Sequence, residues 1–177
     1  MKIVPLQSEV HNRDYFSCGV EELDAYLKKY ALQDTKRNLS KVFFMEGRIS
    51  GEIIGYYSLS SFSFSKSEIT PGISKKLPRY PIPAILLGRL AMGIDHQGKR
   101  FGAKLLMDAL LRVQKVSESF GIYAVVVDAK DEKASAFYQR FGFIPFEEKT
   151  KRLFVPLEVI KKLSSPLLHE EMALGLK

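Results

Sequence analysis

The stretch of residues 86–103, LLGRLAMGIDHQGKRFGA, decides the fold of this chain. Its apolar first half predicts a strand, and a helical pattern begins directly after the basic, glycine-containing loop of residues 97–102. The first N–H groups of a helix lack partners within the helix, and the helix dipole favours negative charge there. A strand, such a loop and a helix N-terminus, in this order, predict an anion site suited to the phosphates of a nucleotide or coenzyme.

Hydrophobic periodicity on both sides of this stretch predicts further strands and helices. The expected helices cover residues 20–37, 102–117 and 131–141. The expected strands cover residues 3–5, 41–46, 52–61, 85–94, 122–128, 143–146 and 153–155. Prolines, serines and a glycine in residues 62–83 predict a long ordered loop between the third and fourth strands.

This order of elements predicts an α+β fold with a central mixed sheet. The helix of residues 102–117 connects two strands, 85–94 and 122–128, and such a crossover makes them parallel neighbours. The chain has 177 residues with no repeats and no linker-like segment, so we expect one domain, residues 1–177.

The composition excludes several classes of protein. No apolar run reaches the roughly eighteen residues that a membrane span needs, and the N-terminus MKIVPLQSEV lacks the features of a signal peptide. Cys18 is the only cysteine, so no disulfide can form within the chain. A cytoplasmic location is therefore the expectation.

The basic residues are clustered in a chain of net charge +7. Lysine and arginine far outnumber acids in residues 28–41 and again in residues 75–104, where Asp34 and Asp95 are the only acids. Clustering of this kind suggests a polyanionic ligand, either nucleic acid or a multiply phosphorylated cofactor. The alternative is a basic surface that faces only solvent.

Two motifs carry a family resemblance. The loop Gln97-Gly98-Lys99-Arg100-Phe101-Gly102-Ala103 lies between a predicted strand and a predicted helix, and Ala134-x-x-x-Tyr138-x-x-x-Gly142-Phe143 follows a Val-rich strand. This arrangement resembles the GNAT acetyltransferase family over nearly the whole chain. The resemblance implies a mostly antiparallel sheet, flanked by helices, whose two parallel central strands splay apart in a V. It also implies acetyl-CoA as the cofactor.

Four segments resemble, more narrowly, the toxin branch of that family, which acetylates aminoacyl-tRNA. They are residues 16–19 (FSCG), 30–40 (YALQDTKRNLS), 77–83 (LPRYPIP) and 125–130 (VVVDAK). The resemblance implies that the chain is the toxin of a toxin–antitoxin pair. It further implies a homodimer and a small antitoxin partner with a DNA-binding module of ribbon-helix-helix type.

The resemblance also assigns roles to residues. Tyr138 matches the tyrosine that protonates the departing thiolate of coenzyme A, a role that suits a phenol with a pKa of ~10. Phe137 would flank the pantetheine arm. The strand edge whose backbone pairs with that arm consists of Leu90, Ala91 and Met92. The pyrophosphate loop consists of Gln97, Gly98, Lys99, Arg100, Phe101, Gly102 and Ala103.

The implied reaction is direct attack of a primary amine on the thioester, with backbone N–H groups near residues 90–92 stabilising the oxyanion. The loop departs from the family at one position, because Arg100 stands where the first glycine of Gln-x-x-Gly-x-Gly is expected. Glycine permits positive φ and close approach of backbone to phosphate. We expect the site to survive, because the helix N-terminus and Gly102 remain.

Basic side chains are expected to hold the tRNA acceptor stem through its phosphates, so that activity falls with salt. They are Lys28, Lys29, Lys36, Arg37, Lys75, Lys76 and Arg79. Two alternatives stay open. One is an acetyltransferase of a small-molecule or protein amine. The other is a basic nucleic-acid-binding module with a degenerate coenzyme site, at which Arg100 hints.

The remaining candidates carry less chemistry. Cys18 is predicted to be a packed side chain rather than a nucleophile. Asp95 and Asp128 are possible general bases, but water can take this role, and an amine that is already neutral needs no base. Spacing alone would make Tyr138 a core aromatic, and only its context favours the catalytic role. No metal is expected, because the three histidines have no ligand spacing. They are His11, His96 and His169.

Overall fold

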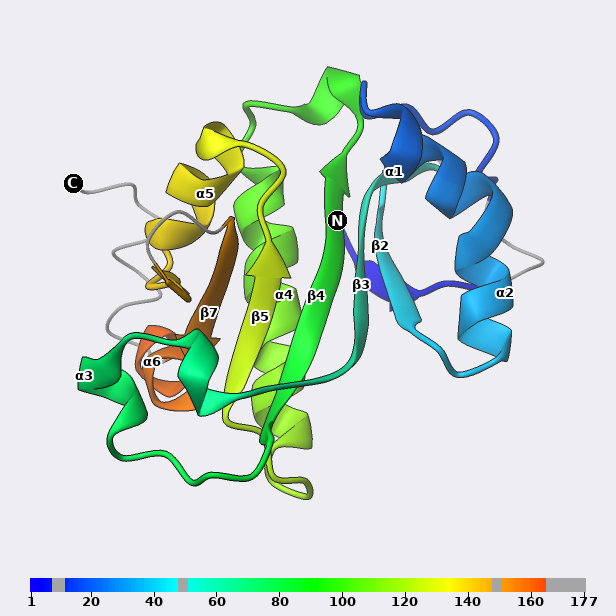
Figure 1. The fold of residues 1–177 in the computed structure, drawn as a ribbon. Coiled ribbons are helices and arrows are strands. Elements are labelled where there is room, and N and C mark those ends of the chain that lie inside the picture. The colour runs from blue at the N-terminus through cyan, green and yellow to red at the C-terminus, as the bar shows by residue number, and fades with distance from the viewer. Residues whose placement is uncertain (8–11, 48–50, 148–150, 165–177) are drawn as a thin grey trace. The chain divides into compact units, whose positions relative to one another are not determined.

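The computed structural model describes residues 1–7, 12–47, 51–147 and 151–164 (Figure 1). Its described residues form one seven-stranded sheet in the order β1-β2-β3-β4-β5-β7-β6. The central strands β4 and β5 pair in parallel, whereas β1 with β2, β2 with β3, β5 with β7 and β6 with β7 are antiparallel. The predicted α+β fold with a mixed, mostly antiparallel sheet is therefore confirmed.

The chain forms two compact units, which are described in turn. Unit 1 comprises Met1–Ser60 and Leu87–Ala109, and unit 2 comprises Ser61–Leu86 and Leu110–Lys177. Three elements contribute residues to both units. They are β3 (Ile53–Phe64), β4 (Ile82–Met92) and α4 (Phe101–Val116).

Unit 1 packs one continuous helical segment onto its strands. The segment runs through α1 (Glu21–Ala25), the π-helical turn η1 (Tyr26–Tyr30) and α2 (Ala31–Lys36). Tyr26 and Leu27 are buried in one cluster with residues of β2 and β3, among them Phe44 and Tyr56. The strands completing the unit are β1 (Ile3–Pro5) and β2 (Lys41–Glu46).

The start of this helical segment is fixed by a side chain from inside the helix. The Asp24 carboxylate accepts hydrogen bonds from the Cys18 N–H at 2.8 Å and from the Ser17 hydroxyl at 3.1 Å. Partial burial works to raise the pKa of Asp24, but these hydrogen bonds outweigh it and lower that pKa. The FSCG segment is thus anchored to α1 before it enters the sheet.

Unit 2 buries an aromatic cluster beneath its strands. Phe64, Phe146 and Phe154 pack there with Ala124 and Val126 of β5. The strands are β5 (Ala124–Asp128), β6 (Ile144–Pro145) and β7 (Arg152–Pro156). The helices are η2 (Lys66–Glu68), α3 (Pro71–Ser74), α5 (Glu132–Gln139) and α6 (Leu157–Leu163).

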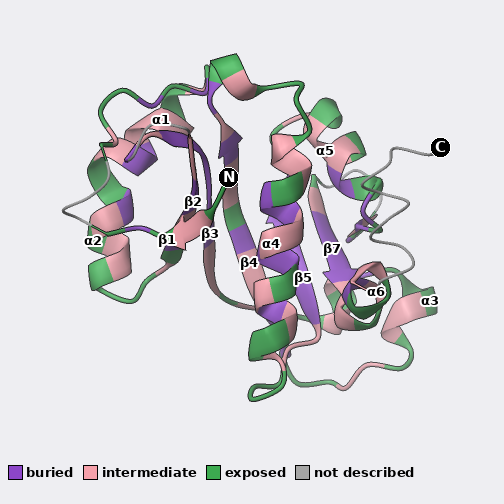
Figure 2. Ribbon diagram, turned by 180° about the vertical axis from the view of Figure 1, so that it is seen from behind, coloured by how far each residue is buried: buried purple, intermediate pink, exposed green. Residues whose placement is uncertain are grey.

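Helix α4 follows the loop that holds the short helix η3 (Ile94–His96). Figure 2 shows a buried stripe along one side of α4 and exposed residues along the other. The stripe consists of Leu105, Leu106, Ala109, Leu110 and Val113. No helix among the described residues is long and apolar enough to cross a membrane.

Two predicted boundaries were wrong because apolar side chains within a polar stretch of sequence are buried. β3 continues to Phe64 and β4 begins at Ile82, because both side chains lie in the unit 2 core and are at most 3% exposed. β4 also ends at Met92, before the predicted limit. The sequence missed α6, and the tail beyond residue 164 lies outside the described residues.

Candidate active site

Strand β4 offers a free edge along its second half. Its pairing with β5 runs from Ala84↔Ala124 to Leu86↔Val126 and stops there. Beyond Leu86, β4 keeps β3 on one edge, and no described strand pairs with the other. Every second backbone N–H and C=O of a strand points to each edge, so this edge can pair with an extended ligand. The three predicted strand-edge residues all lie here. They are Leu90, Ala91 and Met92.

The loop after β4 is held by its own backbone and by one glutamine. The N–H of Gly93 donates to the Ile54 carbonyl at 2.8 Å, and that of Ile94 to the Ser17 carbonyl at 2.9 Å. The Gln97 side-chain amide donates to the carbonyls of Cys18 at 3.0 Å and Met92 at 3.1 Å. Gln97 therefore braces the loop against β4 and the FSCG segment rather than pointing an unused amide at a ligand.

The tip of the loop presents backbone donors. The N–H groups of Gly98, Lys99 and Arg100 donate to no acceptor in the described part of the chain. Helix α4 begins at Phe101, so the next N–H groups lack helical partners as well. Consecutive free N–H groups at the positive end of a helix dipole form a cradle for an anion. The tip of the loop therefore presents a row of backbone donors at a helix N-terminus.

Arg100 adopts a backbone conformation that favours glycine. Its φ is +62°, and that of Gly98 is +74°. A left-handed conformation costs a non-glycine residue about 1 kcal/mol. The backbone at this position therefore adopts a conformation that glycine favours despite the arginine, whose side chain is exposed.

Tyr138 lies in unit 2, on the last turn of α5. Asp131 caps the start of that helix by accepting the Ala134 N–H at 2.7 Å. The helix ends at Gln139, and Gly142 beyond it has a φ of +80°. The N–H groups of Phe141 and Phe143 return to the Tyr138 carbonyl at 2.9 and 3.4 Å. Both ends of α5 are therefore fixed, and so is the position of this tyrosine.

The environment of Tyr138 is apolar. Its ring packs against Phe137 and Phe143, each with a centroid separation of 5.3 Å. This burial raises the pKa of the Tyr138 hydroxyl, so the group keeps its proton at any physiological pH. The hydroxyl has no hydrogen-bond partner among the described residues, yet it is not sealed from solvent. A protonated hydroxyl of this kind can donate its proton to a reacting group.

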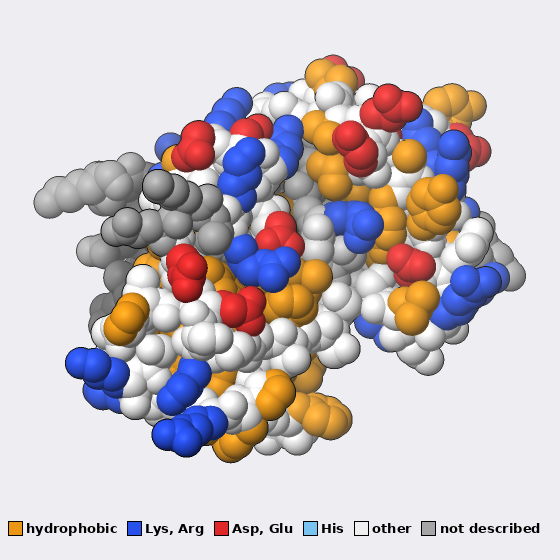
Figure 3. Space-filling model, in the orientation of Figure 1, with side chains coloured by type: hydrophobic (Ala, Val, Ile, Leu, Met, Phe, Trp, Pro, Cys, Tyr) orange, Lys and Arg blue, Asp and Glu red, His pale blue; other side chains and the backbone are white. Residues whose placement is uncertain are grey.

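The predicted tRNA contacts are divided between the two units. In unit 1, Lys29, Lys36 and Arg37 are exposed, and Lys28 is half-buried. In unit 2, the predicted contacts come directly after α3 in the sequence. Figure 3 shows blue side chains gathered over this segment. Those residues are Lys75, Lys76 and Arg79, all exposed. None of the seven forms an ion pair with a described carboxylate.

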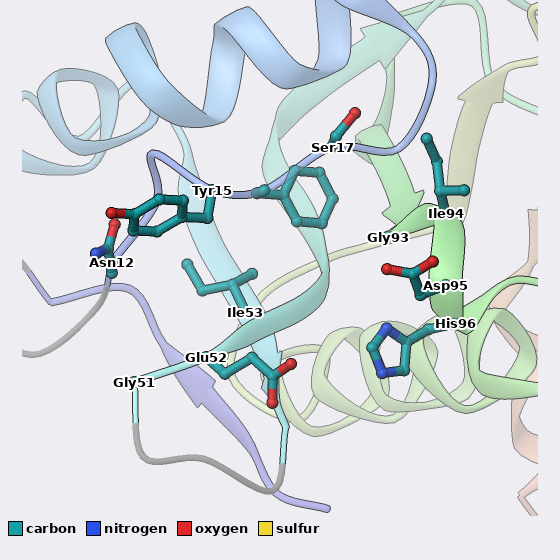
Figure 4. Close-up of a pocket in the computed structure, with 11 residues that line it drawn as sticks. Asn12, Tyr15, Ser17, Gly51, Glu52, Ile53, Gly93, Ile94, Asp95 and His96 are labelled. Carbon is teal, nitrogen blue, oxygen red and sulfur yellow. The ribbon is translucent and has the colours of Figure 1, made fainter.

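Unit 1 also contains a pocket of about 400 Å³ that the sequence did not reveal (Figure 4). Its walls come from the FSCG segment, the start of β3 and the loop after Met92, with Glu52, Asp95 and His96 among them. No periodicity links these three segments, so sequence reasoning could not assemble them. No cluster of metal-ligating side chains occurs within the described ranges.

The carboxylate of Asp128 is already engaged. It forms a bidentate pair with Arg152, at 2.7 Å to Nε and 3.0 Å to the terminal nitrogen, and this pairing raises the pKa of Arg152. Both oxygens of Asp128 are thus occupied by N–H donors of Arg152. The structure therefore argues against Asp128 as the general base.

Cys18 is buried, as the sequence predicted, and burial raises the pKa of its thiol to about 11. At pH 8 the thiolate fraction is then roughly a hundredfold below that of a free cysteine. We expect iodoacetamide to label Cys18 at least tenfold more slowly in the native chain than after unfolding in urea, as measured by intact-mass analysis. Equal rates in the two states would contradict a buried, protonated thiol.

Comparison with known proteins places this geometry in a family. The model of the acetyltransferase (GNAT) family matches residues 7–143. The chain is 30% identical over 169 residues to a probable toxin TacT of Sinorhizobium fredii, covering 91% of this chain and 93% of the relative. It is 37% identical over 128 residues to a tRNA-acetylating toxin of Mycobacterium tuberculosis, covering 72% and 75%.

Two solved structures share the fold at similar identity. AtaT complexed with acetyl-methionyl-tRNAfMet has a TM-score of 0.85 at 29% identity, over 93% of this chain and 99% of that one. A mutant AtaT toxin bound to the C-terminus of the antitoxin AtaR and acetyl-CoA has a TM-score of 0.78 at 28% identity, over 92% and 96%. With its free β4 edge and N–H-rich loop, this chain belongs to the GNAT family of acetyltransferases.

Proposed function

We propose that this chain transfers acetyl from acetyl-CoA to the α-amine of an aminoacyl-tRNA, as the toxin of a toxin–antitoxin pair. The observation that carries the proposal is the free edge of β4 running directly into an N–H-rich loop and the N-terminus of α4. The similarity to tRNA-acetylating toxins supports the choice of amine. The exposed, unpaired cations of both units suit a polyanionic substrate.

The residues present fit acetyl-CoA as the acetyl donor. The β4 edge at Leu90, Ala91 and Met92 would pair with the amide groups of the extended pantetheine arm. The loop and first turn of α4, residues 97–103, would receive the pyrophosphate through backbone N–H groups. Phe137 is half-buried on α5 and would supply an apolar wall beside the pantetheine. Acetyl-CoA supplies an activated thioester, and the chain orients it.

Groups of the chain would then stabilise the charge that develops during the reaction and transfer the protons. A neutral amine attacks the thioester carbonyl directly, and a backbone N–H of the β4 edge stabilises the negative charge on the carbonyl oxygen. As the C–S bond breaks, the Tyr138 hydroxyl donates its proton to the thiolate, and the proton that the attacking nitrogen loses passes to solvent, from which Tyr138 is reprotonated. An aminoacyl ester has a less basic α-amine than lysine, so the substrate needs little help to lose its own proton.

The antitoxin, the oligomeric state and the location are part of the same proposal. We propose an antitoxin with a ribbon-helix-helix DNA-binding module, a homodimeric toxin and a cytoplasmic location. A solved relative bound to the C-terminus of an antitoxin supports an antitoxin partner. We also propose that both units form one catalytic domain, since the family match spans residues of each.

The test is mass analysis of a charged tRNA pool after incubation with acetyl-CoA and the protein. We expect acetylated aminoacyl groups on one or a few tRNA species, and none when acetyl-CoA is omitted. Acetylation of small amines or protein lysines, with no acetylated aminoacyl-tRNA, would overturn the choice of substrate while leaving the enzyme class intact.

The Arg100→Gly variant tests the loop. We expect acetyl-CoA affinity to be kept or improved, because the cradle consists of backbone N–H groups and glycine adopts the left-handed conformation without strain. We also expect the free energy of unfolding to change by no more than about 1 kcal/mol, because relief of strain offsets the added chain entropy of glycine. Calorimetric titration and denaturant melts measure both. A tenfold loss of affinity would show that the guanidinium binds phosphate directly.

A further inference from the structure

Arg89 is a cation one residue before the β4 edge that would bind the pantetheine. It is half-buried, and its guanidinium carbon lies 3.5 Å from the centroid of the Tyr26 ring. No described carboxylate forms an ion pair with it. When a guanidinium stacks on a tyrosine ring, its flat face contacts the ring. Its N–H donors lie in the guanidinium plane and remain available for a ligand.

The two tyrosines beneath Arg89, Tyr26 and Tyr56, are held in place by hydrogen bonds. The Tyr26 hydroxyl shares a hydrogen bond with Ser40 at 2.9 Å, and the Tyr56 hydroxyl donates to the Leu23 carbonyl at 2.7 Å. The rings of Tyr26 and Tyr56 stack at 6.3 Å. Burial raises the pKa of both tyrosines, while the charge of Arg89 acts on both in the opposite direction. Tyr26 also opens the π-helical turn η1, a feature that is frequent at functional sites.

The side chain of Arg89 lies on the opposite face of the sheet from that of Met92, the last residue of β4 before the coenzyme loop. Arg89 and Ala91 project toward the helical segment, since Ala91 packs in the cluster that contains Tyr26. Met92 projects to the opposite face, because a Cβ on Gly55 would meet both its sulfur and Leu105 of α4. The phosphate loop begins beyond Met92, and three residues of strand span about 10 Å. Arg89 is therefore placed for an anion of the acceptor substrate.

We propose that Arg89, held flat on Tyr26, binds a phosphodiester in the 3′-terminal CCA of the acceptor RNA. The proposal rests on the proposed function, in which the amine to be acetylated is esterified to the last ribose of that CCA. A bidentate guanidinium on the neighbouring phosphate would place that amine at the β4 edge. Arg89 is thus a positioning residue, and its contribution is separate from the long-range attraction of the exposed lysines.

The test compares two RNA hairpins derived from one acceptor stem, one ending in CCA and one trimmed of it, both without an amino acid. Equilibrium binding is measured for the wild type, Arg89→Gln and a matched control, Lys115→Gln, which removes an exposed lysine of α4. We expect Arg89→Gln to weaken binding of the CCA hairpin at least tenfold and that of the trimmed hairpin less than twofold. Lys115→Gln should leave both hairpins within twofold of the wild type.

Two further variants separate positioning from structure. Arg89→Lys keeps the charge but loses the planar fork, so we expect an intermediate loss on the CCA hairpin. Tyr26→Phe keeps the ring and should bind as the wild type does. For all variants, acetyl-CoA affinity should stay within twofold.

The proposal is overturned if Arg89→Gln weakens both hairpins equally, if it weakens neither, or if it also abolishes acetyl-CoA binding. Because no outcome depends on turnover, these results stand apart from the acetylation of charged tRNA. A wild type that binds the CCA hairpin through Arg89 but acetylates no aminoacyl-tRNA would refute the proposed function alone.

Discussion

Replacing Tyr138 with phenylalanine is expected to lower kcat by about 10² to 10⁴, the range typical of a lost general acid. The acetyl-CoA dissociation constant should stay within about twofold, because the ring that packs between Phe137 and Phe143 is preserved. Steady-state rates on aminoacyl-tRNA and calorimetric titration of acetyl-CoA measure the two quantities. Tyr123→Phe is the matched control, since it removes another partly buried tyrosine hydroxyl of unit 2.

The pH dependence sharpens this expectation. A general acid must hold its proton, and burial raises the pKa of Tyr138 above the ordinary tyrosine value of 10.0. The wild-type rate should therefore rise with pH as the amine loses its proton and then stay level through about pH 9.5, with no alkaline decline from the acid. A decline centred below pH 9 would contradict a buried tyrosine in this role. Unchanged kcat in Tyr138→Phe would show that water protonates the thiolate.

Salt is expected to weaken tRNA binding by roughly 10³-fold or more between 50 and 200 mM, if the predicted cations contact phosphates. Replacing Lys29, Lys36 and Arg37 with glutamine should reduce the slope of log affinity against log salt by about one per residue. Each phosphate contact releases a condensed counterion, and the effect does not depend on sequence. Filter binding over a salt series measures the slope.

The control for that experiment changes three other exposed lysines, Lys115, Lys133 and Lys161, to glutamine. It removes the same charge from the chain, so net charge alone predicts equal effects in the two triple variants. We expect the control to leave the salt slope nearly unchanged. Equal slopes in both variants would mean that the basic segments attract RNA only through the net charge of +7.

Local sequence determined the elements around the phosphate loop. The apolar stretch of residues 86–94, the basic glycine-containing loop and the amphipathic pattern after it specify a strand, a turn and a helix N-terminus by short-range rules. The structure places β4, η3 and α4 within a few residues of those limits. The parallel pairing of β4 and β5 also followed from the sequence, because a helical crossover returns the chain to the end of the sheet from which the first strand started.

Tertiary packing determined what short-range patterns could not. Phe64 and Ile82 extend β3 and β4 into a proline- and serine-rich stretch, because the unit 2 core buries them. Arg152, which is 24 residues away along the chain, pairs with Asp128 and occupies both oxygens of this candidate base. The Arg89 stack on Tyr26 joins residues far apart in sequence whose spacing carries no pattern.

The phosphate loop also combines features that the sequence predicts with features that only tertiary packing determines. Its sequence alone determined that an N–H-rich loop precedes a helix, since helix ends always leave backbone donors unpaired. Only the tertiary structure showed that Arg100 keeps a left-handed φ of +62° and that Gln97 braces the loop against Cys18 and Met92. Backbone conformation at a non-glycine residue and contacts across 79 residues depend on how the whole unit packs, which no local pattern records.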